Sequence, residues 1–200
     1  METTKIKNPN PHKAEIREAG RKTAKPLLYI GIVSIVMLFA GLTSAYVVRA
    51  DNGNWLVFDL PKIVFVSTAL IITSSLTMLL AQRAIKKDQL SQTAFYLMVT
   101  LALGIGFFFT QIQGWKDLTA QGIYFVGKYS NASGSFLYII ALLHLLHMVG
   151  GLIALLVSLT KTLLKKYSSA DYLGIELTAI YWHFLDLLWV YLFLFLYNYR

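Results

Sequence analysis

Residues 174–197 read GIELTAIYWHFLDLLWVYLFLFLY, an apolar stretch that is interrupted by two carboxylates and one histidine. A helix of about 20 predominantly apolar residues is long enough to cross the hydrocarbon core of a membrane. Barrel strands are shorter, about 9–11 residues, and alternate polar with apolar side chains, which this stretch does not do. The stretch therefore predicts a transmembrane α-helix.

Four further segments share this length and apolar character: residues 27–49, 61–81, 93–115 and 136–160. The whole chain is 56% hydrophobic and 14% charged, whereas globular proteins average about 25% charged residues. The absence of cysteine from the sequence excludes disulfides, iron–sulfur clusters and thiolate ligands. We therefore predict an all-α fold, an integral membrane bundle of five transmembrane helices over residues 27–200. A basic arm over residues 1–26 precedes it and ends at Pro26, which suits the first turn of a helix.

Basic residues outside the five segments predict the orientation of the chain in the membrane. The arm and the connections after the second and fourth segments hold 13 of the 18 Lys and Arg residues. Because positively charged residues gather on the cytoplasmic side, the N-terminus is predicted inside and the C-terminus outside. We therefore interpret the net charge of +8 as a sign of how the chain is oriented in the membrane. We expect no nucleic-acid partner, because no aromatic residues suited to base stacking are interleaved with these charges.

Five ionisable side chains lie inside the last two segments: His144, His147, Glu176, His183 and Asp186. His144 and His147 are about one helical turn apart, as are His183 and Asp186, and Glu176 lies about two turns before His183. Ionisable groups within a bilayer are energetically costly, so they face protein or water and often mark function. These residues form the candidate intramembrane polar core.

Three interpretations of this polar core compete. Histidines and carboxylates are ligands for zinc, iron or haem, but a di-iron bundle draws carboxylates from four helices, and the first three segments contain no buried acid or histidine. A proton pathway would need buried polar groups that continue beyond Asp186, and the sequence offers none. The favoured interpretation is structural: His183 and Asp186 hydrogen-bond to His144 and His147 and join the last two helices. We accordingly expect no catalytic and no metal-binding residue in this chain.

Aromatic and small residues indicate how the helices pack. Trp182 and Trp189 lie two turns apart within the last segment, away from the ends where an interfacial aromatic belt forms, so we expect them to pack against another helix. The second segment carries a stripe of small, weakly polar residues at helical spacing: Ser67, Ser74, Thr77 and Ala81. Such a stripe is typical of helix contacts in membranes.

The last segment also carries a motif, Glu176-Leu-Thr-Ala-Ile-Tyr181-Trp182-His183-Phe-Leu-Asp186-Leu-Leu-Trp189. This motif resembles the final helix of subunit III of haem–copper terminal oxidases, which reads Tyr-Trp-His-Phe-x-Asp-x-x-Trp after a Glu. The stretch from His144 to Gly150 is similar to the His-x-x-His-x-x-Gly pattern of that family. Residues 37–46 and 67–75 are similar to two of its earlier helices, so the resemblance extends over almost the whole chain.

The resemblance implies a five-helix, bacterial form of subunit III. Such a chain is a non-catalytic part of a cytochrome c or quinol oxidase in the bacterial cytoplasmic (inner) membrane. It packs on catalytic subunit I, with subunit II in the same complex, binds phospholipid, and supports proton uptake and protects the catalytic subunit during turnover. Haem and copper are expected in the partner subunits and no cofactor in this chain. The electron donor and membership of a larger respiratory supercomplex stay open.

Two other classes of function remain as alternatives. The runner-up is a haem- or quinone-binding membrane anchor, with His144 or His147 paired to His183 across two helices. The third is a small proton-coupled transporter, although no inverted repeat or broken helix is visible.

Two departures from the family pattern also matter: Ile35 and Gly114 stand where the family often has a Glu. Any contribution to proton supply that depends on those two carboxylates is therefore in doubt.

Overall fold

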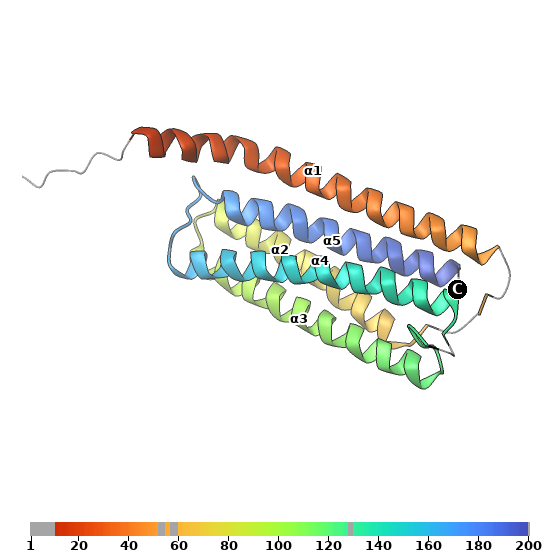
Figure 1. Ribbon diagram of the computed structural model, residues 1–200. Helices are drawn as coiled ribbons and strands as arrows, with labels where there is room; N and C mark the ends of the chain where they lie inside the picture. The colour runs from red at the N-terminus through yellow and green to blue at the C-terminus, as the bar shows by residue number, and fades with distance from the viewer. Residues whose placement is uncertain (1–10, 52–54, 57–59, 128–129, 200) are drawn as a thin grey trace, which may run out of the picture.

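Five long helices make up most of the described part of the chain, as Figure 1 shows. The computed structural model describes residues 11–51, 55–56, 60–127 and 130–199, with side chains from residue 18 onward. The helices are α1 (Pro11–Ala50), α2 (Ile63–Lys86), α3 (Leu90–Ala120), α4 (Ala132–Leu163) and α5 (Leu173–Asn198). All five are long and apolar enough to cross a membrane. The prediction of an all-helical membrane bundle is therefore confirmed.

The ends of the helices follow from local backbone chemistry. The Asn131 side chain caps α4 by accepting a hydrogen bond from the Ser133 backbone N–H at 3.0 Å, the role for which Asn is favoured at this position. After α3, Gly122 has a φ of +80°, which ends the helix at no steric cost because glycine has no Cβ. Asp88, two residues after the end of α2, adopts a φ of +57° and turns the chain into α3.

Helix α1 begins earlier than the sequence predicts. It starts at Pro11, and Pro26 lies inside it, so the prediction that Pro26 stands in its first turn is wrong. The residues before Pro26 are rich in Ala, Glu, Lys and Arg, which favour helix, and Lys22 pairs with Glu18 four residues away at 2.9 Å. Part of the predicted basic arm, residues 1–10, lies outside the described residues.

The five helices form one bundle, in which α4 and α5 each contact three other helices. Helices α2 and α3 make an antiparallel pair, α4 and α5 complete the core, and α1 lies along α4 and α5 (Figure 1). Trp182 is fully buried and Trp189 is 3% exposed, and their indole nitrogens donate to Ser74 and Thr68 of α2, each at 3.1 Å. The prediction that both tryptophans pack against another helix is confirmed.

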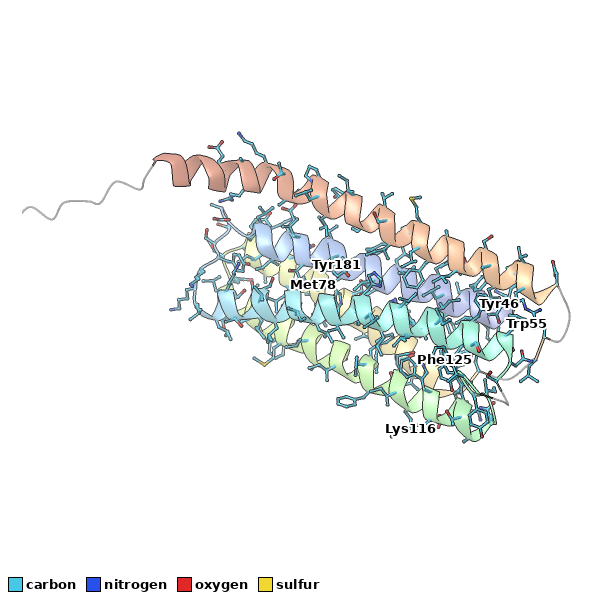
Figure 2. The ribbon with its side chains drawn as sticks, in the orientation of Figure 1. Tyr46, Trp55, Met78, Lys116, Phe125 and Tyr181 are labelled. Carbon is cyan, nitrogen blue, oxygen red and sulfur yellow. The ribbon has the colours of Figure 1, made fainter. Side chains whose placement is uncertain are left out.

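A cluster of aromatic residues, separate from Trp182 and Trp189, lies at the end of the bundle where α1 and α5 finish. Tyr46 is fully buried, its ring meets Trp55 edge-on with centroids 4.6 Å apart, and its hydroxyl donates to the Tyr199 carbonyl at 3.3 Å. Figure 2 shows Tyr46 and Trp55 together at this end. The cluster ties the C-terminal ends of α1 and α5 to the connection that follows α1.

Candidate functional site

A row of polar contacts runs between α5 and α2. His183 Nδ1 lies 2.7 Å from the Ser75 hydroxyl oxygen, next to the bond between Trp182 and Ser74. Trp189, seven residues after Trp182 on α5, donates to Thr68, which lies six residues before Ser74 on α2. Because α2 and α5 run in opposite directions, these similar spacings bring the two polar contacts into register, about two helical turns apart.

Asp186 lies beside this row and is 4% exposed. The Ser74 and Ser75 hydroxyls are its polar neighbours, but Ser74 already donates to the Ile71 carbonyl at 2.7 Å and Ser75 is engaged with His183. Neither carboxyl oxygen of Asp186 meets a donor at hydrogen-bond geometry in the described part of the chain. Asp186 is therefore a buried carboxyl group whose polar surroundings come from α2.

The two histidines of α4 face other neighbours. His144 is 1% exposed, and its ring packs between Phe107 of α3 and Trp189 of α5, with centroid distances of 5.9 and 5.1 Å. His147 Nδ1 bonds to the carbonyl oxygen of Leu143 in its own helix at 2.7 Å. The ring of His147 meets Phe39 of α1 at 5.9 Å. Neither histidine is hydrogen-bonded to α5 through its ring.

The prediction that His183 and Asp186 hydrogen-bond to His144 and His147 is therefore wrong. The one-turn spacing in α5 correctly places His183 and Asp186 close together, but the neighbouring helix that they meet is α2 rather than α4. The sequence did contain a signal for the contact between α5 and α2, because Ser74 belongs to the stripe of small polar residues on α2. Ser74 accepts the hydrogen bond from Trp182 and is a neighbour of Asp186. Helices α4 and α5 are instead joined by the Ser158 and Thr178 hydroxyls, 2.8 Å apart.

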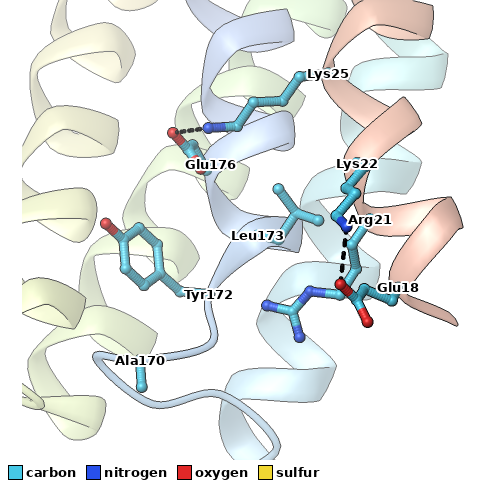
Figure 3. Close-up of a pocket in the computed structure, with 8 residues that line it drawn as sticks. All are labelled: Glu18, Arg21, Lys22, Lys25, Ala170, Tyr172, Leu173 and Glu176. Carbon is cyan, nitrogen blue, oxygen red and sulfur yellow. Dashed lines mark hydrogen bonds and ion pairs between the residues drawn. The ribbon is translucent and has the colours of Figure 1, made fainter. Parts of the chain in front are cut away.

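Glu176 lies apart from the other four residues of the predicted polar core. It stands in the first turn of α5, and its carboxylate accepts from Lys25 Nζ of α1 at 2.7 Å (Figure 3). Close by, Arg21 pairs with Asp171 at 2.9 Å. Lys25 and Arg21 were not predicted as partners of these carboxylates, because the predicted basic arm placed both residues outside the helices.

The polar residues do not converge on a common point. Among the residues that the structure describes, no three His, Asp or Glu side chains lie close enough together to hold a metal ion. His183 is bonded to α2, His147 packs on α1, and His144 lies against α3 and Trp189. A pairing of His144 or His147 with His183 on one haem is therefore not favoured by this arrangement.

Five membrane-length helices, joined by polar contacts between α2 and α5, define a multi-pass helical membrane protein. The family model for cytochrome c oxidase subunit III matches residues 55–200. The chain therefore belongs to the cytochrome c oxidase subunit III family, and the matched region contains the α5 motif and both α4 histidines.

Individual relatives agree with this assignment. A probable cytochrome c oxidase subunit 3 of Nocardia farcinica is 34% identical over 179 residues, which cover 86% of this chain and 85% of that protein. A probable cytochrome c oxidase subunit 3 of Mycobacterium tuberculosis is 30% identical over the same shares of both chains. The similarity extends to animals, since the cytochrome c oxidase subunit 3 of Spodoptera frugiperda is 31% identical over 139 residues, 68% of this chain and 88% of that protein.

Ile35 and Gly114, the two positions expected to depart from the family pattern, both have apolar neighbours. Ile35 packs against the cluster that contains Phe39 and Tyr46. Gly114 is buried, and a Cβ at this position would lie 3.4 Å from Ile63 at the start of α2. The local packing is therefore built around the small and apolar residues present here.

Proposed function

We propose that this chain is the non-catalytic subunit III of a bacterial cytochrome c oxidase. The observation that carries the proposal is the α5 motif as the structure uses it: Trp182, His183 and Trp189 each bond to a side chain of α2. These side chains therefore serve to hold helices together. Oxygen reduction and its haem and copper belong to the partner subunits, and the site residues of this chain are structural.

The proposed setting is the bacterial cytoplasmic membrane, with the N-terminus inside. The excess of Lys and Arg on one side supports this orientation. The start of α1, the connection from α2 to α3 and the connection from α4 to α5 lie at one end of the bundle (Figure 1). Asp88 and Ser169 join the two connections through a hydrogen bond of 2.7 Å. Most of the basic residues of the chain belong to these three segments.

The proposed partners are catalytic subunit I and subunit II of the same oxidase, together with phospholipid. The names of the relatives favour cytochrome c over quinol as the electron donor of the complex. Large apolar side chains cover the exposed surfaces of the helices, including Phe95, Phe109 and Leu187 at 61%, 66% and 71% exposure. Such surfaces suit contact with lipid or with other transmembrane helices.

Purification of the tagged chain from membranes in mild detergent tests this proposal. We expect it to bring down a large polypeptide and a reduced-minus-oxidised spectrum of a-type haem, and the haem signal should leave with the partners when they are stripped away. A b-type signal that stays with the isolated chain would instead establish the haem-anchor alternative. Recovery of the chain with neither haem nor a partner would refute both functions.

A further inference from the structure

Four buried nitrogen atoms in α3 and α4 have no partner inside the chain. They are Nε1 of Trp115, Nε2 of Gln111 and both ring nitrogens of His144. None of them meets a hydrogen-bond partner among the residues that the structure describes, and Gln111 and His144 are only 6% and 1% exposed. Because the surrounding hydrocarbon offers no hydrogen bonds either, these groups need a partner small enough to lie inside the bundle.

The four nitrogens belong to one line of contact between α3 and α4. These helices run in opposite directions (Figure 1), and two ring contacts define their register: Phe107 with His144 at 5.9 Å and Trp115 with Tyr138 at 6.2 Å. Gln111 is four residues from both Phe107 and Trp115, so its level on α3 is midway between the two contacts. Trp115, Gln111 and His144 therefore follow one another along the bundle at steps of about 6 Å.

These steps have the length that one bridging water molecule spans. Two groups that bond to the same water are each about 3 Å from its oxygen atom, so they lie at most about 6 Å apart. The end of α3 also has room for a molecule of this size. A Cβ at Gly114, between Gln111 and Trp115 on α3, would come no closer than 3.4 Å to another helix, at Ile63 of α2. A water molecule is comparable in size to the methyl group that would fit there.

The hydrogen-bonding capacity of these groups changes in order along the line. The Trp115 indole nitrogen and the Gln111 amide nitrogen can only donate, with one N–H and two N–H bonds respectively. A neutral imidazole has one donor nitrogen and one acceptor nitrogen, and His144 stands at the far end. Donors at one end and an acceptor at the other suit a chain of water molecules, because each water both accepts and donates.

The Trp115 end of the line lies next to a hollow in the surface of the bundle. The hollow has a volume of about 420 Å³ and is lined by Ile112, Trp115, Lys116, Thr119 and Ala120. Figure 2 shows Lys116 at the end of the bundle where α3 finishes, and this exposed cation places the hollow at the boundary with water. Trp115 lines the hollow while its Nε1 is enclosed. Its indole ring therefore separates the hollow from the interior of the bundle.

We propose that a file of ordered water molecules runs from this hollow to His144, near the middle of α4. One water accepts hydrogen bonds from Trp115 and Gln111. The next accepts the other N–H of the Gln111 amide and donates to the acceptor nitrogen of His144, whose own N–H donates to a third. Buried waters typically make about three hydrogen bonds to groups that would otherwise be unpaired. The file gives a buried histidine contact with water from the end of the bundle where α3 finishes.

X-ray radiolysis of the tagged chain, purified from membranes with its partners, tests the file. Radiolysis of a bound water molecule yields hydroxyl radicals that oxidise the side chains beside it, and mass spectrometry of the peptides locates the oxidation. Trp182 is the internal reference, because it is fully buried and its indole nitrogen already donates to Ser74. Gln111→Leu removes the middle of the file at similar volume. Gln113→Leu makes the same change at an exposed position of the same helix.

We expect Trp115 and His144 to be oxidised in the wild type and Trp182 to be protected. In Gln111→Leu the oxidation of His144 should fall about fivefold, the factor that corresponds to one lost hydrogen bond of about 1 kcal/mol. Gln113→Leu should leave it unchanged. Protection of His144 in the wild type, or equal oxidation of His144 in both variants, would overturn the proposal.

The entrance of the file is tested by mixing the sample with water labelled with oxygen-18 shortly before irradiation. Ala120→Trp covers the hollow, and Gln121→Trp adds the same ring at the next residue, which is exposed and does not line it. Labelled oxygen should appear at His144 severalfold more slowly in Ala120→Trp than in Gln121→Trp. Equal rates would refute entry through the hollow.

Electron cryomicroscopy at a resolution that shows ordered water provides a measurement without any variant. We expect density for water between Trp115, Gln111 and His144, and a direct hydrogen bond between Gln111 and His144 in its place would overturn the file. The inference concerns the interior of this chain and does not depend on the proposed function. Haem spectra and subunit content, recorded on the same samples, test that function separately.

Discussion

The indole ring of Trp182 lies directly over Gly104. A Cβ at residue 104 would be 2.6 Å from Cη2 of Trp182 and 2.9 Å from Leu152, closer than real Cβ atoms approach. On the other side, a Cβ at Gly151 would be 3.3 Å from the same indole ring. The indole nitrogen reaches Ser74. A single side chain of α5 is therefore in contact with α2, α3 and α4, and the two glycines create the space for it.

Gly104→Ala should destabilise the oxidase-bound subunit. The added methyl group overpacks the site, which typically costs about 1–3 kcal/mol, because a fully buried indole ring has no room to withdraw. Gly106→Ala is the matched control on the same helix, since a Cβ there meets only Leu70, at 3.8 Å. Alanine favours helix over glycine by about 1 kcal/mol, so the control should be neutral or stabilising. Thermal dissociation of the subunit from the purified complex measures both, and equal effects would contradict this account.

Ser74→Ala should weaken the contact between α2 and α5. The substitution removes the acceptor of the Trp182 indole N–H and leaves that group unpaired, and interhelical hydrogen bonds in membranes average about 0.6 kcal/mol. A double-mutant cycle with Trp182→Phe isolates this coupling from the change in packing. Thr73→Ala, at an exposed position that bonds only to its own helix, serves as the control. A coupling free energy of zero would show that the bond contributes nothing.

Tyr138→Phe should loosen the start of the connection between α3 and α4. The Tyr138 hydroxyl lies 3.1 Å from the Ile123 carbonyl and 3.2 Å from the Trp115 carbonyl, and a hydrogen bond of this kind contributes about 1 kcal/mol. We expect amide exchange at residues 121–127 to accelerate about fivefold, the factor that corresponds to that free energy. Tyr124→Phe changes a 41% exposed ring and should leave exchange unaltered. Unchanged exchange in Tyr138→Phe would refute this role.

Asp88 should make one contact pH-dependent. Hydrogen bonds from the Ser169 side chain and backbone N–H, each 2.7 Å long, lower the pKa of the Asp88 carboxyl below its usual value. Because the folded-state pKa is depressed, its contribution to stability is present above the usual pKa of about 4 and is lost as the pH falls through the lower value. The connection between α4 and α5 should therefore loosen only in acid.

Asp88→Asn tests this charge effect without disturbing the backbone, because asparagine tolerates the positive φ of +57° at this position. At pH 7 we expect faster amide exchange at residues 167–171 in the variant than in the wild type. The difference should shrink as the pH is lowered below about 4, where the wild-type carboxylate becomes protonated. A difference that is independent of pH would mean that the charge of Asp88 has no part in the contact.

The number and type of elements could be predicted from the sequence, but their pairing could not. Long apolar stretches predict transmembrane helices because a bilayer requires that each spanning segment satisfy its own backbone hydrogen bonds. Apolar length did not predict the start of α1, because residues 11–25 are polar. This part of the helix is held to the bundle by two ion pairs, Arg21 with Asp171 and Lys25 with Glu176. Those partners are 150 and 151 residues away.

By itself the sequence determined the membrane class, the five helices and, through the α5 motif, the family that the comparisons confirmed. Periodicity also determined that His183 and Asp186 share a face of α5. Only the tertiary structure decided that this face meets Ser75 of α2. It also decided that Glu176 lies apart from the polar core and pairs with Lys25 of α1. The physical reason is that a one-turn spacing specifies a direction around one helix axis, whereas the neighbour in that direction depends on how all five helices pack.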